Sequence, residues 1–168
     1  MVFFIHSKKY GPHKVEIDDE DAERILKHIW HVLYEQKPIR LASVITNIPD
    51  GKKQKTVYLH RMLVPYDKVD HIDGNPLNNR KSNLRACDDA QNAQNSRKRI
   101  NNKSGFKGVR YLKSKGHIYI TAKICVNYRH IHLGCFKTLE EAARAYNEAA
   151  KKHHGEFARL NEIEEAAQ

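Results

Sequence analysis

The chain has 168 residues, enough for one domain or two small ones, and an apolar fraction of 40% allows only a modest core. No run of about 18 apolar residues occurs, and the start MVFFIHSKKYG lacks the charge order and cleavage site of a signal peptide, so we expect a cytoplasmic protein without membrane contact. The net charge of +10 favours a polyanionic partner, nucleic acid being the commonest, although solubility alone is the plainer alternative.

The first expected element is a helix over residues 14–36, after a short strand. Acidic residues at positions 18–21 suit a helix N-terminus, because the helix dipole favours negative charge there. Apolar residues then recur at helical spacing as far as position 33. We expect Trp30 to lie in the core.

Two runs rich in apolar and β-branched residues follow, at 40–46 and 56–64. Between them lies the sequence PDGK at 49–52, which is a turn signal. The two runs therefore predict a β-hairpin.

The next stretch, VDHIDGNPLNNRKSNL at residues 69–84, is too polar for a core strand. Asp70 and His71 are expected at the end of a strand, Asn83 on the returning chain and Asn92 on the helix that follows. A strand, a return and a helix could bring all four side chains to one point. Spacing alone leaves open a plain polar loop.

The four residues would make coherent chemistry. A carboxylate and an amide oxygen are hard ligands that suit Mg²⁺, and a neutral histidine beside the metal can take a proton from water. An amide that accepts from the other ring nitrogen would hold the imidazole in the right tautomer. Metal, base and water together can break a phosphodiester bond. The remaining amides are expected only to make turns: Asn75, Asn78 and Asn79.

Here the sequence resembles a known family. The string VDHIDGNPLNNRKSNL…AQNAQN, preceded by YLHR at 58–61, is similar to the HNH nuclease motif of phage and intron-encoded homing endonucleases, over roughly residues 55–97. The resemblance implies two strands and a helix around one divalent metal, Mg²⁺ being expected and Mn²⁺ the alternative. Carried over, the metal ligands are Asp70 and Asn92, the general base is His71, and its orienting residue is Asn83.

The resemblance assigns no single role to three further residues. The resemblance leaves open whether His60 takes part in chemistry or only packs near the site, and it allows Arg61 and Arg80 to contact phosphate. The family's usual zinc-binding cysteines are absent, and no zinc is expected. The cysteines that the chain has are far apart and form no C-x-x-C pair, so no disulfide framework is expected either: Cys87, Cys125 and Cys135.

A basic segment without acidic residues follows the motif. No Asp or Glu occurs from position 90 to 139, where about six would be expected pro rata, whereas eleven Lys or Arg do. Asp88 and Gln91 predict a capping box on a helix from 89 to about 97. The polar, basic stretch that comes next reads as a linker at 98–104, with a domain boundary near residue 100, and its start is expected to bind DNA through Arg97, Lys98 and Arg99.

The C-terminal part predicts three antiparallel strands and one helix. Residues 117–126 alternate between apolar and polar side chains, with shorter strands expected at 109–112 and 129–136. Thr138 and Glu141 form a capping box that opens an alanine-rich helix ending near residue 155. Its alanines would let the helix lie close against the sheet.

This part has a resemblance of its own. Residues 104–161 are similar to the DNA-binding domain of plant ethylene-response factors, the Apetala family, whose three-stranded sheet enters the DNA major groove. The sheet positions that reach DNA in that family correspond to Lys107, Arg110, Tyr119, Lys123, His130 and His132. The sequence departs from the plant pattern at Leu112 and Cys125, where the plant domains carry arginines, so base preference cannot be transferred. Each histidine has a solvated surface role as its alternative.

We therefore expect an α+β protein: an HNH ββα-metal nuclease domain, then a three-stranded antiparallel sheet packed on one helix. The expected ranges are 1–97 for the nuclease domain, 98–104 for the basic linker, 105–161 for the sheet domain and 162–168 for a tail. The expected function is metal-dependent cleavage of double-stranded DNA, one strand at a time, by a monomer with a homing or mobile-element role. The alternatives are a DNA-binding regulator with an inactive nuclease half and a basic RNA-binding protein.

Overall fold

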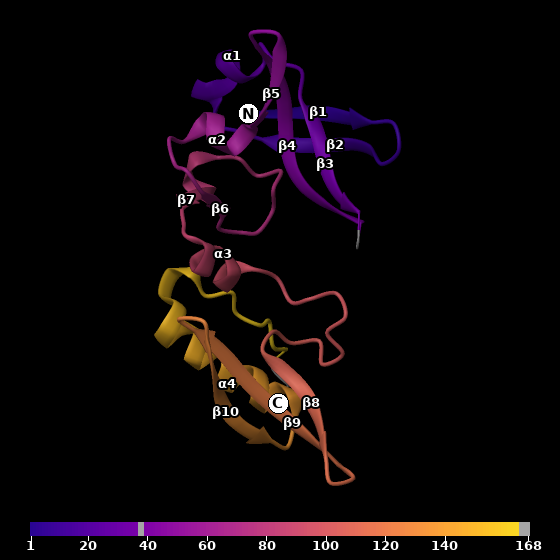
Figure 1. Ribbon diagram of the computed structural model, residues 1–168, viewed down its shortest axis with the longest axis vertical. Helices are drawn as coiled ribbons and strands as arrows, with labels where there is room; N and C mark the ends of the chain where they lie inside the picture. The colour runs from indigo at the N-terminus through magenta and orange to yellow at the C-terminus, as the bar shows by residue number, and fades with distance from the viewer. Residues whose placement is uncertain (37–38, 165–168) are drawn as a thin grey trace. The chain divides into compact units, whose positions relative to one another are not determined.

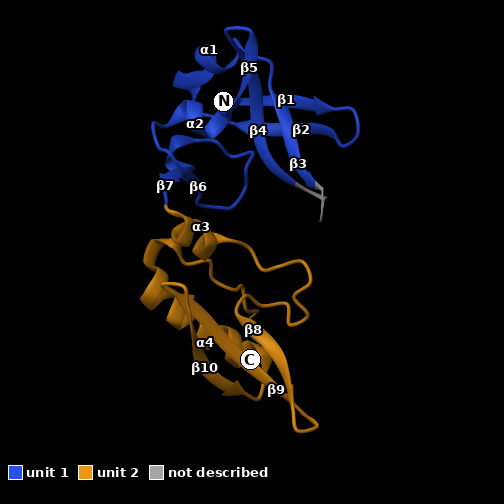
Figure 2. Ribbon diagram, viewed as in Figure 1, with its two compact units in different colours: residues 1–87 blue, residues 88–168 orange. Residues whose placement is uncertain are grey.

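The computed structural model describes residues 1–36 and 39–164. The fold is mixed α/β, with several antiparallel sheets and few helices, as Figure 1 shows. Within the described residues, no helix is long and apolar enough to cross a membrane. Figure 2 shows two compact units, Met1–Cys87 and Asp88–Gln168. The division lies before the boundary that we expected near residue 100, and the functional division of the chain stays a prediction.

The first unit begins with an antiparallel pair of strands rather than with one strand and a long helix. These elements are β1 (Val2–Ser7), β2 (Gly11–Glu16), the 3-10 turn η1 (Asp19–Asp21), α1 (Ala22–Ile25) and β3 (His31–Gln36). The helix predicted over residues 14–36 is therefore wrong apart from one turn of α-helix. The apolar residues Leu26 and Ile29 are 50% and 79% exposed, so the helical stripe is not used, and pairing of β3 with β4 takes its place.

Trp30 is buried, as expected, and its indole Nε1 donates to the carbonyl of Ile25 at 2.8 Å. That bond closes the short helix against the core. The core of this unit is built from residues of both strand pairs and both helices, and its fully buried side chains include Val15, Ile17, Ile25, Val44 and Leu59.

The predicted hairpin is present as β4 (Ile39–Asp50) and β5 (Lys53–Tyr58), in a sheet of order β3-β4-β5. Gly51 makes the turn at a φ of +61°, which glycine adopts without strain. The second run was expected to stay extended to residue 64, but it turns into the helix α2 (Leu59–Leu63). Leu59 and Leu63, one helical turn apart, are both buried in the core, and that burial favours the helix.

The polar stretch forms a small ribbon of two strands. Strand β6 (Val69–His71) pairs antiparallel with β7 (Leu84–Ala86), and the 3-10 turn η2 (Lys81–Asn83) leads into β7. The expected strand end for Asp70 and His71 is confirmed, as is the return for Asn83.

The second unit starts with α3 (Asp89–Asn95), which carries the predicted capping box of Asp88 and Gln91. The segment after it is a loop held by hydrogen bonds of its own. Ser104 is buried, and its hydroxyl donates to the carbonyl of Val109 at 2.8 Å. The amide oxygen of Asn102 accepts from the backbone of Ser104 at 2.9 Å.

The C-terminal strands and helix follow the prediction. They are β8 (Val109–Ser114), β9 (His117–Val126), β10 (Arg129–Phe136) and α4 (Leu139–His154), with a closing 3-10 turn η3 (Gly155–Phe157). The sheet order is β10-β9-β8, and α4 packs on one face. Each of the two hairpin turns has two central residues with the positive φ that tight hairpins require. These are Lys115 and Gly116 in the first turn and Asn127 and Tyr128 in the second.

Helix α4 lies close to the sheet because small residues face it. Ala122 in β9 and Ala142 and Ala143 in α4 are fully buried against each other. At Gly108, a Cβ would lie 2.0 Å from the ring of Tyr146, so only glycine fits between the sheet's edge and the helix. The second unit therefore has a core of its own.

Candidate active site and nucleic-acid interface

Asp70 is buried and faces an arginine across the ribbon. The register pairs Asp70 with Arg85, and its Oδ2 accepts from Nε at 3.1 Å and from Nη2 at 2.8 Å. The side chains are 7% and 12% exposed, so the ion pair is shielded from solvent. A carboxylate that is buried together with a matching guanidinium is held in one orientation.

His71, next along β6, faces a buried asparagine. The ring Nε2 lies 3.2 Å from Oδ1 of Asn79. The amide of Asn79 is oriented by its Nδ2, which donates to the carbonyl of Pro76 at 3.0 Å. Since an amide oxygen only accepts, Nε2 carries the proton and Nδ1 is the unprotonated nitrogen.

The charge state of His71 follows from its surroundings. Burial lowers the pKa of His71 below the ordinary value of 6.5, while the hydrogen bond to Asn79 and the charges of Asp73 and Asp70 act in the other direction. The net shift is downward, so the imidazole is neutral at pH 7. A neutral imidazole is the form that accepts a proton.

A second histidine contacts the first edge-on. The ring of His60, in α2, lies edge-on to that of His71 with centroids 5.3 Å apart and planes at 86°. Burial, then the charges of His71 and Arg61, lowers the pKa of His60 to about 4. The ring centroids of Tyr58 and His60 lie 5.5 Å apart, and the Arg61 guanidinium lies 5.1 Å from the Tyr58 ring centre. His60 therefore contacts the site as a neutral ring.

Asn83 holds the turn of the motif. Its Nδ2 donates to Oδ1 of Asp73 at 3.0 Å and to the carbonyl of Asn78 at 2.8 Å, and its Oδ1 accepts from the backbone of Asp73 at 3.1 Å. Asn75 and Asn78 also hydrogen-bond to Asp73, as turn residues do. We expected Asn83 to orient His71, but the amide that the structure places on the His71 ring is that of Asn79.

Asn79 was expected only to make a turn, yet it is 1% exposed. Its backbone N donates to the carbonyl of Glu16 at 2.8 Å, which fixes the residue from β2. The sequence signal that separates Asn79 from its neighbours is weak, because asparagines that make turns and asparagines that orient a base look alike. The hydrogen bond between Asn79 and Glu16 joins residues that are distant in sequence, so it is seen only once the chain is folded.

Asn92 lies on α3, as expected, and its side chain is exposed. It belongs to the second unit, and the structure does not place it relative to Asp70 or His71. Arg80 pairs with Glu16 through Nη2 at 3.2 Å. The structure thus brings Asp70, His71 and Asn83 together, and it adds Asn79 to them.

The chemistry of these residues fits a hard divalent cation. Carboxylate and amide oxygens are the ligands that Mg²⁺ and Mn²⁺ prefer. Among the residues that the structure describes, no three His, Cys, Asp or Glu side chains converge on one point. A cation held by Asp70 would therefore complete its shell with amide oxygens, water or substrate.

In the second unit, the sheet residues expected to reach DNA share one face. The register sets Arg110 beside Thr121, Tyr119 beside Leu112, Lys123 beside His132, and Cys125 beside His130. Because side chains alternate along a strand, these residues all lie on the face opposite α4, which we call the outer face. Tyr119 is 42% exposed there.

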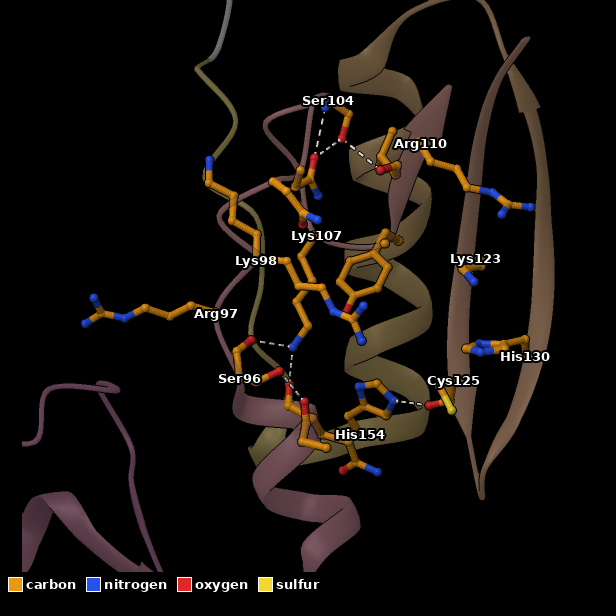
Figure 3. A pocket seen from close by; sticks show the side chains of 18 of the residues that line it. Ser96, Arg97, Lys98, Ser104, Lys107, Arg110, Lys123, Cys125, His130 and His154 are labelled. Atoms are coloured by element: carbon orange, nitrogen blue, oxygen red, sulfur yellow. Dashed lines mark hydrogen bonds between the residues drawn. The ribbon is translucent and has the colours of Figure 1, made fainter. Parts of the chain in front are cut away.

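A cavity of about 770 Å³ borders the outer face within the same unit. Figure 3 shows it between the loop that follows α3, the strands and α4. Its lining includes most of the basic residues of the acid-free segment: Arg97, Lys98, Arg99, Lys103, Lys107, Arg110, Lys123 and His130. Tyr119 and His132 do not line it.

Lys107 does not extend from the sheet. Its Nζ donates to the carbonyls of Ser96, at 2.7 Å, and Gln94, at the end of α3 (Figure 3). Its backbone is bound on both sides by the amide of Asn161, at 2.6 and 3.0 Å. Burial, then the charge of Arg159, lowers the pKa of Lys107 to about 8. A lysine at the last carbonyls of a helix complements the helix dipole.

Comparisons with known proteins match the same stretch of the chain to a family. Residues 57–94 match the family described as HNH endonuclease. An uncharacterised HNH endonuclease of Acanthamoeba polyphaga mimivirus is 34% identical over 119 residues, which cover 68% of this chain and 60% of that protein. Protein 3.8 of Escherichia phage T7 is 36% identical over 96 residues, or 55% of this chain and 74% of that protein. No solved structure matches the chain.

The matched segment begins at the end of β5 and ends in α3, so it contains the side chains around the Asp70–His71 pair. It includes His60, the Asp70–His71 pair, Asn79, Asn83 and Asn92. HNH nucleases generally use a divalent metal ion, which agrees with the ligand chemistry found here. The chain therefore carries an HNH endonuclease domain at residues 57–94.

Proposed function

We propose that the protein is a metal-dependent endonuclease that hydrolyses phosphodiester bonds in double-stranded DNA. The observation that carries this proposal is the state of His71. It is a neutral imidazole whose Nε2–H is directed to the oriented amide of Asn79, so that Nδ1 is the basic nitrogen. That arrangement suits a general base.

His71 acts by taking a proton from water at Nδ1. The positive charge that forms on the ring is favoured by the nearby carboxylates of Asp70 and Asp73 and by the hydrogen bond to Asn79. The burial that lowers the pKa of His71 keeps the ring neutral before the step. The ring therefore begins as a base and is stabilised when it becomes an acid.

Asp70 and Asn92 are the ligands that we propose for one divalent cation, Mg²⁺ or else Mn²⁺. When bound, that cation supplies positive charge to the phosphate and to the leaving oxygen. Arg85 fixes the Asp70 carboxylate through Oδ2. Arg61 and Arg80 are proposed contacts to phosphate, and Asn83 keeps the turn that carries Asn79.

The second unit is proposed to position the cut. Its outer face would lie in the major groove, where a small sheet fits the groove width of about 12 Å. We propose that the outer-face residues reach base edges and that the basic loop after α3 binds the backbone. A single Asp-His pair per chain supports a monomer that nicks one strand. A homing or mobile-element role, inside a host cell, is the setting that we propose.

The test is cleavage of supercoiled plasmid with Mg²⁺, with and without chelator. Cleavage should require the metal, and His71→Ala should lower the rate about 10²–10⁴-fold, which is the usual contribution of a general base. DNA affinity should stay unchanged in this variant. His6→Ala, at an exposed histidine of β1, is the matched control and should cleave normally. Cleavage by His71→Ala at the unaltered rate would sink the assignment.

A further inference from the structure

The cavity of the second unit has one wall that the sheet does not supply. Arg99 and Lys103 lie on the loop after α3, whereas Arg110 and Lys123 lie on the outer face of the sheet. The loop is fixed at both ends, because Lys107 is bound to the end of α3 and Ser104 is buried. The loop after α3 and the sheet thus both place cationic side chains around the same cavity.

We propose that this cavity binds phosphate groups of the DNA strand whose bases the outer face reads. This proposal rests on the DNA-binding role proposed above and deepens it. The loop that follows α3 is then one wall of the binding site rather than a tether. The strand's backbone passes from the outer face into the cavity at the edge where β9 extends beyond β8.

The charge of the cavity supports an anionic ligand. Within residues 1–36 and 39–164, no carboxylate lies within ion-pair distance of the four cations that carry this argument: Arg99, Lys103, Arg110 and Lys123. A solvated surface usually mixes charges of both signs. One carboxylate, Asp89, also lines the cavity, but basic residues predominate, and like charges close together are stabilised when an anion enters.

The floor of the cavity is formed in part by a buried histidine. His154 is 7% exposed, and its Nε2 donates to the carbonyl of Cys125 at 2.8 Å (Figure 3). Its other nitrogen, Nδ1, is buried and has no hydrogen-bond partner among the described residues. Because Nε2 donates, Nδ1 of the neutral ring can only accept a hydrogen bond, so His154 closes the floor of the cavity and is not a phosphate ligand.

The size of the cavity decides what can enter. A volume of about 770 Å³ lies in the range of roughly 300–1,000 Å³ that is typical of small-molecule sites. It therefore has room for a nucleotide-sized piece of one strand. Arg110, Lys123 and His130 line the cavity and also lie on the outer face, so a strand in contact with the face reaches the cavity without a gap.

Salt titration of DNA binding by the full chain tests the proposal. A labelled duplex is titrated with protein in chelator, so that nothing is cut, at several salt concentrations. The double variant Arg99→Gln/Lys103→Gln should lower the slope of log affinity against log salt by about 1.8, since each lost phosphate contact is worth about 0.9. The control Arg144→Gln/Lys152→Gln removes two exposed cations of α4 outside the cavity and should leave the slope unchanged.

The outcomes separate this proposal from the proposed function. A slope that is unchanged in the cavity variant, or lowered equally in the control, overturns the cavity site while DNA binding stands. Failure of the unaltered chain to bind duplex at low salt overturns both the cavity site and the DNA-binding role. Displacement of the duplex by micromolar free deoxynucleotide would show a nucleotide site in place of a backbone site. None of these results depends on cleavage.

Discussion

Replacement of Asn79 gives the sharpest test of how the base is oriented. Asn79→Ala removes the acceptor of the His71 Nε2–H, at 3.2 Å, and the donor to Pro76, at 3.0 Å. Two such bonds are worth about 0.5–1.5 kcal/mol each, so the free energy of unfolding should fall by about 1–3 kcal/mol. The ring then loses its fixed tautomer, and the cleavage rate should drop about 10–100-fold, as with other residues that orient a metal-site side chain.

The pH profile distinguishes orientation from simple damage. The hydrogen bond to Asn79 raises the pKa of His71, against the larger effect of burial. Asn79→Ala should therefore move the acid limb of the rate profile to lower pH, because a base with a lower pKa stays neutral further into acid. If the substitution only opened the site to water, the pKa of His71 would return to its ordinary value, and the acid limb of the rate profile would move to higher pH.

Two further variants complete this test. Asn79→Asp keeps the shape and adds a negative charge beside the ring, so the acid limb should move to higher pH. Asn75→Ala, at an exposed turn residue, is the matched control and should leave the limb in place. The assay is the initial rate of plasmid cleavage from pH 5 to 9, with unfolding followed separately. A limb that shifts in Asn83→Ala but not in Asn79→Ala would refute the reasoning.

Three other predictions follow from the structure. Arg85→Met removes the guanidinium that faces the buried Asp70 carboxylate and should lower the free energy of unfolding by about 3–5 kcal/mol, and Mg²⁺ should raise the melting temperature more in this variant than in the unaltered chain. Gly108→Ala should destabilise the chain by several kcal/mol in thermal unfolding, because the new Cβ meets an aromatic ring at 2.0 Å, whereas Gly116→Ala, at a similar φ in open space, should cost only about 1–2 kcal/mol. Sedimentation with digestion of strand-labelled duplex should show a monomer that cuts one strand, and a stable dimer cutting both strands at once would contradict this.

The second unit could be predicted well because its signals are local. Alternation along β9 and turn residues such as Asn127, which tolerates a φ of +48°, specify the hairpins within a few residues of chain. The capping box at Thr138 sets the start of α4 in the same way. Each signal lies inside the element that it predicts.

The first unit could not be predicted as far, because its elements depend on distant partners. The stripe of apolar residues before Trp30 fits a helix, yet the segment after Trp30 pairs with β4 and becomes a strand. Helical spacing alone cannot show that a better partner exists elsewhere in the chain. The role of Asn79 was missed for the same reason, since it depends on a backbone contact with Glu16.

The backbone around Glu16 also bears on how far the nuclease motif can be moved between proteins. Glu16 donates to the carbonyl of Leu77 at 2.9 Å and accepts from Asn79, and Asp18 accepts from the backbone of Lys81, 63 residues away, at 2.8 Å. The segment that matches the family, residues 57–94, contains none of these N-terminal partners. A motif excised at those limits would leave Asn79, the proposed orienting residue, without the backbone contact that holds it to β2. A host scaffold would need to offer an exposed strand edge of its own to receive residues 77–81 before the transplanted histidine could act as a base.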